Sequence, residues 1–346
     1  MHFKDLEINN FRGFDHLKIE DFGQINLFVG KNNSGKTSVL EALTFLLIPE
    51  NPQIASSLNT HIREIAIRDV FDFINFFHNQ DSQNNPKIEA KIGNYTKKEN
   101  IQERALILSL SDLPTYDLRG YPTTATFIAT YYIDKETFEL KTTFENGYIP
   151  KYESNVKNYS KINSQLIAGE KPFQHLYFYV GKLRETKSIS RLVDVLKKIE
   201  PRLEDIEVID GKVLLNLKGM DKLLPINFNG DGIIKVATII ATISWITNGV
   251  VLIDEIENGL HYSAHKTLWK GIIEACRMSD TQIFATTHSL ESIKYLKEAL
   301  EEEGFQDFQE KVRCFHIEKT KLAGFQTYKY NFESFREALK YETELR

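Results

Sequence analysis

The chain has 346 residues, of which 42% are apolar and 26% charged, and its formal net charge is -5. Such a chain is long enough for one large α/β domain or two domains, and its composition is ordinary for a globular protein. The negative charge excludes a general basic field for nucleic acid, so any such contact needs a local patch.

The cysteines and the apolar stretches bear on the cellular compartment in which the protein works. Cys276 and Cys314 each stand alone, which argues against a disulfide framework or a zinc site and fits a reducing cytosol. The first residues do not form a signal peptide. The most apolar stretch, 233–247, is interrupted by Lys235 and is shorter than a membrane span requires. We therefore expect a cytoplasmic protein without membrane contact.

The first fifty residues predict three strands and a helix. Residues 2–9 and 17–20 read as strands, and 25–29 form an apolar third strand. The helix that starts near Ser38 is expected to end at about Leu47, before two prolines. Together they resemble the antiparallel entry to a nucleotide-binding sheet.

The segment between that third strand and the helix reads Gly-x-x-x-x-Gly-Lys-Thr, the phosphate-binding loop. Its glycines let several backbone N–H groups point at one phosphate, and the helix N-terminus adds positive potential. Lys36 would reach the β- and γ-phosphates, and the Thr37 hydroxyl would hold Mg²⁺. A glycine-rich turn with an exposed lysine would not explain this register. The expected nucleotide contacts are Gly30, Asn32, Asn33, Ser34, Gly35, Lys36, Thr37 and Ser38.

Residues 51–170 differ in character, with polar loops between β-type runs. We predict a helix at 62–77 and an inserted, mostly antiparallel β lobe, with hairpin turns at 134–135 and 145–147. No heptad repeat predicts a coiled-coil arm. The predicted strands are 87–92, 104–110, 124–133 and 137–144.

From residue 171 onward, strands and helices alternate, which predicts a largely parallel sheet flanked by helices. The fold class is therefore α/β, with a nucleotide-binding domain formed by 1–50 and 171–346 and the inserted lobe at 51–170. The predicted strands are 174–180, 206–209, 213–217, 223–228, 250–253, 282–285, 312–318 and 326–331, and the predicted helices are 188–199, 233–247, 265–276, 290–301 and 335–341.

Two acids, Asp254 and Glu255, follow the fully apolar strand 250–253. Ligands of open α/β sheets bind at this end of the strands. Asp254 could hold Mg²⁺ through water, and Glu255 could orient or deprotonate the attacking water. An acidic pair that merely ends a surface strand is the alternative, and the phosphate loop makes it the weaker one.

Two further segments are candidates for contacts with the nucleotide. His288 follows the neighbouring strand and could meet a γ-phosphate, although a bystander histidine beside a helix N-cap at Ser289 also fits. Asn229, Gly230, Asp231 and Gly232 precede a helix and could form another anion-binding end, although a tight turn needs the same residues.

Taken in order, these segments resemble an ABC-type ATPase head of the SMC, RecF and OLD (overcoming lysogenisation defect) group. The phosphate loop looks like Walker A, 229–232 like a divergent signature, 253–255 like Walker B and His288 like the switch histidine. The opening around Arg12 resembles the same group, in which the corresponding arginine lies by the nucleotide. Residues 257–261 resemble the D-loop of OLD-like members.

The resemblance implies an ATP-sandwich homodimer or higher oligomer, in which the signature loop of one copy closes on ATP bound to another. Two departures matter. The signature is not Leu-Ser-Gly-Gly-Gln, so Asp231 and Gly232 would do its work. The glutamine loop has two candidate positions, Gln80 and the segment 181–184.

The printed sequence leaves no room for the Toprim nuclease domain of OLD nucleases, so we expect a separate Toprim or HNH nuclease, or a toxin, as partner in antiphage defence. One alternative is a RecF-like clamp on DNA, for which a basic run would serve; the solvated face of helix 188–199 explains that run too. A transporter ATPase and a small-molecule kinase fit less well. The basic run is Lys182, Arg184, Lys187, Arg191, Lys197 and Arg202.

Overall fold

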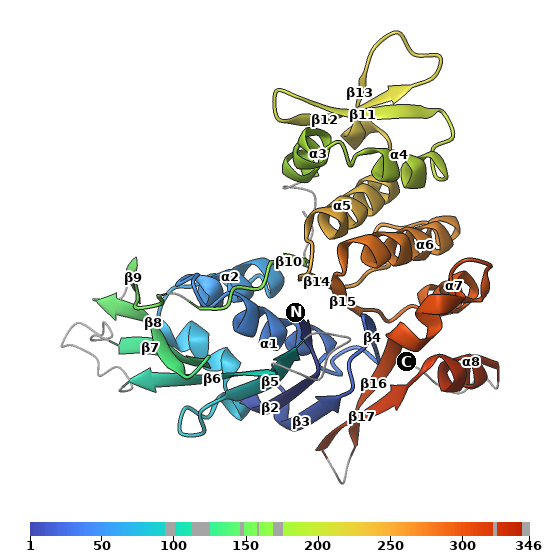
Figure 1. Cartoon of the computed structure of the whole chain (residues 1–346). Coiled ribbons are helices and arrows are strands. Elements are labelled where there is room, and N and C mark those ends of the chain that lie inside the picture. Colours follow the sequence, from blue (N-terminus) through green and yellow to red (C-terminus); the bar gives the residue numbers. More distant parts are fainter. Residues whose placement is uncertain are drawn as a thin grey trace. The chain divides into compact units, whose positions relative to one another are not determined.

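The computed structural model describes residues 1–93, 101–111, 125–145, 149–157, 159–168, 176–320 and 324–340 (Figure 1). These residues form two compact units, described separately below. Unit 1 comprises Met1–Phe22, Lys31–Ile162 and Ile317–Tyr328, and unit 2 comprises Gly23–Gly30, Asn163–His316 and Lys329–Arg346.

Unit 1 is built on an 8-stranded antiparallel sheet with the order β3-β2-β5-β6-β7-β8-β9, in which β1 pairs with β5. Alternate residues of its strands are buried, as expected for a sheet with one solvated face. The strands are β1 (His2–Phe3), β2 (Asp5–Phe11), β3 (Phe14–Glu20), β5 (Lys87–Gly93), β6 (Gln102–Ser111), β7 (Ala125–Ile133), β8 (Glu136–Glu145) and β9 (Ile149–Ser154).

The buried face of this sheet packs on α1 (Lys36–Leu47), α2 (Ile54–Ile62) and the 3₁₀ segment η1 (Val70–Phe76). Phenylalanines dominate this core: the Phe73 and Phe127 rings stack with their centroids 4.6 Å apart, and Phe45 meets Phe76 edge-on at 5.2 Å. Aromatic pairs in these geometries add to the free energy of burial. This core fixes α1, which carries the end of the phosphate loop.

Unit 2 is built on a parallel sheet in which β14 lies between β10 and β15, and β15 pairs with β4. The full order is β10-β14-β15-β4-β16-β17; residues from Ile317 to the end of β16, and β17 as far as Tyr328, are counted with unit 1. The register pairs Ile253 with Ala285, and Ala285 with Leu27, so the carboxyl ends of β14, β15 and β4 lie along one edge. The strands are β4 (Ile25–Val29), β10 (Ser164–Ile167), β14 (Val250–Ile253), β15 (Gln282–Thr286), β16 (Val312–Thr320) and β17 (Gly324–Tyr330).

Helices α5 and α6 pack on each other in unit 2, as do α6 and α7. The Trp269 indole is fully buried and donates its N–H to the Ser292 carbonyl oxygen at 2.9 Å, which ties α6 to α7. A 3-stranded sheet, β11-β12-β13, adjoins α3 and α4. The remaining elements are α3 (Leu176–Glu185), α4 (Ser190–Lys197), β11 (Leu203–Ile209), β12 (Lys212–Leu217), β13 (Leu224–Pro225), α5 (Asp231–Trp245), α6 (Tyr262–Ser279), α7 (Leu290–Glu301) and α8 (Phe332–Lys340).

The predicted helix at 62–77 is only partly formed: residues 70–76 are a 3₁₀ segment, and residues 63–69 are not helical. Helix α2 ends at Ile62, and Glu64 adopts a left-handed φ of 55°. Asp69 then starts η1 with a capping box that involves Asp72, so a local side-chain network competes with the α-helix.

Two predicted strands are wrong. Most of 174–180 lies in helix α3, whose buried residues Leu176, Tyr179, Val180 and Leu183 have helical spacing; residues 174–175 lie outside the described part. Its aromatic residues favoured a strand, and tertiary packing overrode that preference. Of 223–228, only Leu224–Pro225 is a strand and Ile226–Phe228 is a 3₁₀ turn.

The remaining helices and parallel strands lie close to their predicted positions, and β4, β14 and α7 have the predicted bounds. The turn 134–135 joins β7 to β8 with positive φ at both residues, as an antiparallel hairpin needs. The turn 145–147 extends beyond the described residues. The two units do not follow the predicted boundaries at 50 and 170, since β2, β3 and α1 cluster with the inserted strands. The division into a nucleotide-binding domain and an inserted lobe therefore stays a prediction.

Candidate functional site

The phosphate loop leaves β4 at Gly30 and enters α1 at Lys36. Gly35 precedes the helix with a left-handed φ of 90°, and a Cβ there would lie 2.4 Å from the Phe14 ring. Glycine is therefore required at this position for both conformation and space. Helix α1 starts without a side-chain cap. Its N-terminus can thus serve an anion.

Lys36 is 8% exposed and curls over the loop, where its Nζ donates to the Lys31 carbonyl oxygen at 2.9 Å. Asn32 and Asn33 are exposed, and Asn33 has a positive φ of 62°. The buried Ser34 hydroxyl has no hydrogen-bond partner among the residues that the structure describes. These residues thus have the curled backbone and the poised lysine that a phosphate cradle needs.

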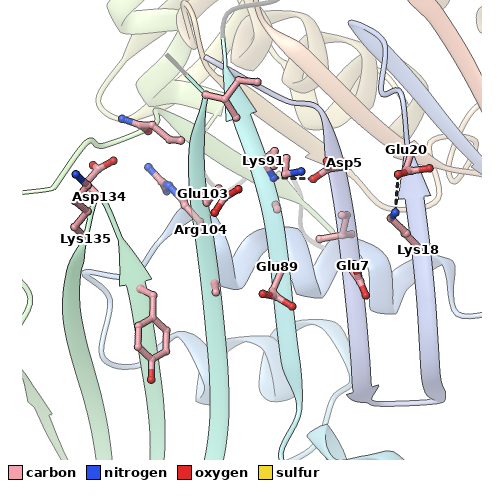
Figure 2. A pocket seen from close by; sticks show the side chains of 16 residues that line it. Asp5, Glu7, Lys18, Glu20, Glu89, Lys91, Glu103, Arg104, Asp134 and Lys135 are labelled. Atoms are coloured by element: carbon pink, nitrogen blue, oxygen red, sulfur yellow. Dashed lines mark hydrogen bonds and ion pairs between the residues drawn. The ribbon is translucent and has the colours of Figure 1, made fainter. Parts of the chain in front are cut away.

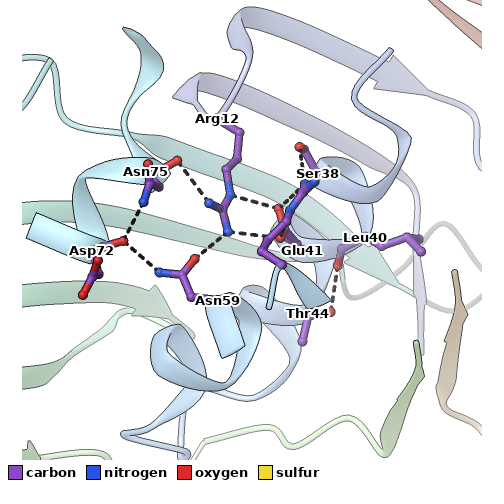
Figure 3. Close-up of polar contacts among 9 residues, drawn as sticks. Arg12, Ser38, Leu40, Glu41, Thr44, Asn59, Asp72 and Asn75 are labelled. Atoms are coloured by element: carbon purple, nitrogen blue, oxygen red, sulfur yellow. Dashed lines mark hydrogen bonds and ion pairs between the residues drawn. The ribbon is translucent and has the colours of Figure 1, made fainter. Parts of the chain in front are cut away.

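A buried ion network in unit 1 fixes the first turns of α1 (Figure 3). Arg12 meets the carboxylate of Glu41 through two hydrogen bonds of 3.0 Å, and Arg63 reaches the same carboxylate at 2.8 Å. The Glu41 side chain is fully buried. Arg63 also donates to the Ser38 hydroxyl at 3.0 Å, so the network extends to the last residue of the phosphate-loop segment.

The contacts of the Arg12 guanidinium all belong to this network and its surroundings. Its guanidinium also donates to the Asn59 side chain at 2.9 Å and lies 4.2 Å from the Phe76 ring centroid. Burial lowers the pKa of Arg12, while Glu41 raises it. Arg12 therefore anchors Glu41 on α1, and its predicted contact with the nucleotide stays a prediction.

The two acids after β14 lie at the carboxyl edge of the unit 2 sheet. The Thr286 hydroxyl at the end of β15 donates to Asp254 Oδ1 at 2.6 Å and accepts from the Glu255 backbone N–H at 2.8 Å. Glu255 is exposed and adopts a left-handed φ of 47°. Such a conformation costs about 1–2 kcal/mol for a residue with a Cβ, so the surroundings must hold it.

Two further residues hold the Glu255 segment. Lys235 on α5, which is 7% exposed, extends its Nζ to the Glu255 carbonyl oxygen at 3.4 Å. Burial lowers the pKa of Lys235, while Glu257, Asp254 and Glu255 raise it. Asn258 hydrogen-bonds the Glu255 carboxylate through its side chain. The predicted hydrolytic carboxylate is thus fixed from several sides although it faces solvent.

His288 lies beside Glu257 in unit 2. Glu257 Oε1 accepts from the His288 backbone N–H at 2.8 Å and lies 3.0 Å from the ring Nδ1. The imidazole is 45% exposed and the Glu257 side chain 9%. A ring held through Nδ1 leaves Nε2 for another partner.

The predicted signature loop 229–232 leads into α5. Gly230 has a positive φ of 81°, and Phe228 before it is 76% exposed. A Cβ on Gly232 would lie 3.6 Å from the Gly259 carbonyl oxygen. The loop therefore adjoins the segment 257–261, which we likened to a D-loop. The Asp231 side chain lies outside the described part.

Four residues of this arrangement were absent from the sequence-based candidates: Glu41, Lys235, Glu257 and Thr286. Glu41 and Lys235 had a signal, because each interrupts an otherwise apolar helical stretch. The glutamine loop stays open, since Gln80 bonds Asn75 and the segment 181–184 lies within α3.

Comparison with known proteins identifies the group. The family model described as "AAA domain" matches residues 5–340. The chain belongs to the AAA domain family. A protein of Helicobacter pylori strain 26695 named "ATP/GTP phosphatase" is 22% identical, covering 90% of this chain and 91% of the relative. The RecF protein of Francisella tularensis subsp. mediasiatica is 27% identical over 68% of this chain and 70% of its own.

Solved structures agree with this family on the fold. The SMC head bound to the C-winged helix domain of ScpA matches with a TM-score of 0.58 at 11% identity, covering 98% of this chain and 100% of that structure. This AAA domain chain therefore has the fold of an ABC-type ATPase head of the SMC and RecF kind, and it is an ATPase. The predicted family, fold class and enzyme class are confirmed.

Two properties of the described residues concern membranes and metal ions. Within the described residues, no helix is both long enough and apolar enough to cross a membrane. Nor do the described residues gather three or more histidine, cysteine, aspartate or glutamate side chains around one cation position.

Proposed function

We propose that the chain is an ATP-driven switch. Two copies close around nucleotide, hydrolysis releases them, and this cycle controls a separate effector, a Toprim or HNH nuclease or a toxin, in antiphage defence. The candidate contacts for ATP are those of the phosphate loop, with Lys36 on the phosphates and Glu255 on the attacking water.

Mg²⁺ fits the donors available. The Thr37 hydroxyl would bind the ion, and Asp254, whose Oδ1 accepts from Thr286, would hold it through water. The ion would neutralise charge on the phosphates. Few protein ligands are needed, because Mg²⁺ usually keeps several waters and takes phosphate oxygens.

The exposure of the hydrolytic groups carries the dimer proposal. Glu255 is exposed and His288 is 45% exposed, yet phosphoryl transfer profits from a closed, water-poor site. A second surface is therefore needed. Phe228, directly before the loop 229–232, and Tyr262, directly after the segment 257–261, are 76% and 61% exposed and offer apolar area that a second copy would bury.

The dependence of turnover on protein concentration tests this proposal. Turnover per subunit should rise with concentration and then level off when two copies form the site. Phe228→Ser should move that rise to higher concentration. Met278→Ser, which changes another side chain (57% exposed) at the opposite end of α6 from Tyr262, should leave it in place. Turnover per subunit that is independent of concentration would contradict the dimer.

Charge pairing favours a protein effector over DNA. In the basic run of unit 2, Lys182 pairs with Glu185 at 2.8 Å, Arg184 with Asp205 at 2.6 Å and Arg202 with Glu200 at 3.0 Å. Such pairs reduce the positive potential that phosphates would meet.

The hollow on the solvated sheet face of unit 1 also favours a protein effector over DNA (Figure 2). It is lined by six carboxylate residues and four basic ones, and acids such as Glu7 and Glu89 stand side by side on β2 and β5. A phosphate backbone would be repelled by this surface.

A RecF- or SMC-like clamp on DNA remains the second candidate, because the RecF relative and the SMC head fold support the clamp as well as they support the switch. The two candidates separate in one pair of assays. DNA binding that requires ATP and falls steeply with salt would support the clamp. Effector-dependent toxicity or phage protection that Lys36→Ala removes, when the chain is co-expressed with a neighbouring nuclease gene, would support the switch.

A further inference from the structure

We propose that Thr286 is a positioning residue for hydrolysis, acting through Asp254 and Glu255. This inference rests on the proposed roles of those two acids. Thr286 ends β15 and is 1% exposed, so its hydroxyl belongs to the interior of unit 2 and is not available to solvent.

The hydroxyl bridges the two acids. It donates its one proton to Asp254 Oδ1 at 2.6 Å and accepts the Glu255 N–H at 2.8 Å. A hydroxyl supplies one donor and two acceptor lone pairs, so a single Thr or Ser can make both bonds. Valine has the same shape and makes neither. The bridge therefore ties the magnesium-side carboxylate and the hydrolytic carboxylate to the same atom.

Glu255 needs such a tie because its backbone is left-handed, with a φ of 47°. Residues with a Cβ adopt this conformation only where neighbours hold it. The backbone N–H bond to Thr286 acts on one side of the residue. On the other side, Lys235 and the Asn258 N–H contact the carbonyl oxygen at 3.4 and 3.0 Å. Loss of the Thr286 bond would free the peptide that sets the direction of the Glu255 side chain.

His288 lies two residues after Thr286, just beyond the end of β15. Thr286 bonds to the Walker B pair through its hydroxyl, and its carbonyl oxygen accepts the Ile256 N–H at 3.0 Å. The chain then reaches His288, whose backbone N–H donates to Glu257. Thr286 therefore fastens the end of β15 to Asp254, Glu255 and Ile256, and His288 adds the contact with Glu257 two residues further along the chain.

The test compares Thr286→Val with Thr286→Ser and with a matched control, Thr238→Val. Thr238 is equally buried on α5 and loses one hydrogen bond, to the Ile234 carbonyl oxygen, without touching either acid. The readouts are ATP affinity, the Mg²⁺ concentration at half-maximal rate, and the single-turnover rate of hydrolysis. Orienting partners of this kind typically change activity or metal affinity by about 10- to 100-fold.

We expect Thr286→Val to lower the hydrolysis rate by roughly 10- to 100-fold and to raise the Mg²⁺ requirement, with ATP affinity without Mg²⁺ within about threefold of the parent. Thr286→Ser should restore most of the rate, and Thr238→Val should leave it unchanged.

The outcomes separate this inference from the function on which it rests. If Glu255→Gln abolishes hydrolysis and Thr286→Val does not reduce it, the positioning role is wrong. If Glu255→Gln itself hydrolyses ATP normally, the proposed role of Glu255 fails first. A Thr286→Ser variant as slow as Thr286→Val would also overturn the inference, because serine keeps the hydroxyl.

Discussion

The phosphate-loop region of unit 1 and the acidic edge of unit 2 differ in how far their charged groups are buried. In unit 1, Arg12 and Arg63 share the fully buried carboxylate of Glu41 on α1, so the start of this helix is held by an ion network that solvent reaches mainly at Arg63, which is 33% exposed. In unit 2, Glu255 and His288 face solvent and are held mainly through their backbones. In the proposed function, the first region binds nucleotide within one chain, and a second copy covers the second region.

This difference suggests how binding and hydrolysis are divided. A preorganised loop loses little entropy when it takes up a phosphate, so one copy can bind nucleotide. Exposed hydrolytic groups act poorly in water, because electrostatic stabilisation is strongest where water is excluded. Binding would therefore precede closure, and closure would switch on hydrolysis. The predictions below act on one region or the other.

Removal of the shared carboxylate should have the largest effect. Glu41→Ala would leave two arginines beside each other without their anion, and breaking a buried ion pair in this way costs about 3–5 kcal/mol. We expect a marked fall in Tm, measured by calorimetry. The matched control is Glu302→Ala, which also removes one carboxylate from two cations, Lys266 and Lys270, but at a position where the carboxylate side chain is 35% exposed to solvent.

The exposed control should change stability by no more than about 1 kcal/mol, because solvent screens such pairs. Equal losses in Glu41→Ala and Glu302→Ala would show that burial of the unit 1 network has no special weight. A large loss confined to Glu41→Ala would sharpen the contrast between the two regions.

Lys36→Ala should weaken ATP binding, because Lys36 supplies a charged hydrogen bond to the phosphates. Loss of such a bond typically costs about 1.5–3 kcal/mol, which is roughly a 10- to 150-fold loss of affinity. Titration calorimetry measures it. Lys31→Ala keeps the carbonyl oxygen that Lys36 contacts, and it should bind ATP nearly as the parent does. Undiminished affinity in Lys36→Ala would refute the nucleotide site.

Glu257→Ala should reduce turnover and leave ATP binding intact. His288 would lose both contacts with Glu257 Oε1, one from its backbone and one from its ring. We expect a loss of about 1–2 kcal/mol in transition-state stabilisation, roughly five- to thirtyfold in rate. Glu257→Gln keeps an oxygen that can accept a hydrogen bond, so its turnover should fall less than that of Glu257→Ala. An equal change in affinity and rate would instead indicate a general disturbance of unit 2.

Thr242→Val should have the smallest effect, and of opposite sign. Thr242 on α5 is fully buried, and its hydroxyl has no hydrogen-bond partner among the described residues. Replacement by the isosteric valine removes a desolvated polar group, so stability should rise by up to about 1 kcal/mol. Chemical denaturation measures it. A loss of stability would mean that the hydroxyl is satisfied after all.

The motifs were predictable from sequence because their chemistry requires fixed residue types at fixed spacing. Residue types and spacing alone assign Gly30–Thr37 to a loop between a strand and a helix, and Asp254–Glu255 to the end of a strand. The supporting residues were not predictable, since Thr286 and Glu257 become relevant only when β15 lies beside β14.

The incorrect elements have a similar cause. Residues 62–77 carry helical spacing, but the capping box at Asp69 redirects the backbone. The aromatic residues of α3 suit a strand, and they form a helix because their buried members pack against α5 and β11. In both segments the local sequence allowed more than one secondary structure. The choice was made by a single side-chain cap in residues 62–77 and by packing against distant residues in α3.

The mass of Glu255→Gln in solution, with and without ATP and Mg²⁺, tests the central claim most directly. This variant should bind ATP and fail to hydrolyse it, so the closed state accumulates. Light scattering should show twice the subunit mass, or a higher multiple, with ATP and a smaller mass without it. The same mass under both conditions, with ATP binding confirmed, would contradict the account in which a second copy completes the site.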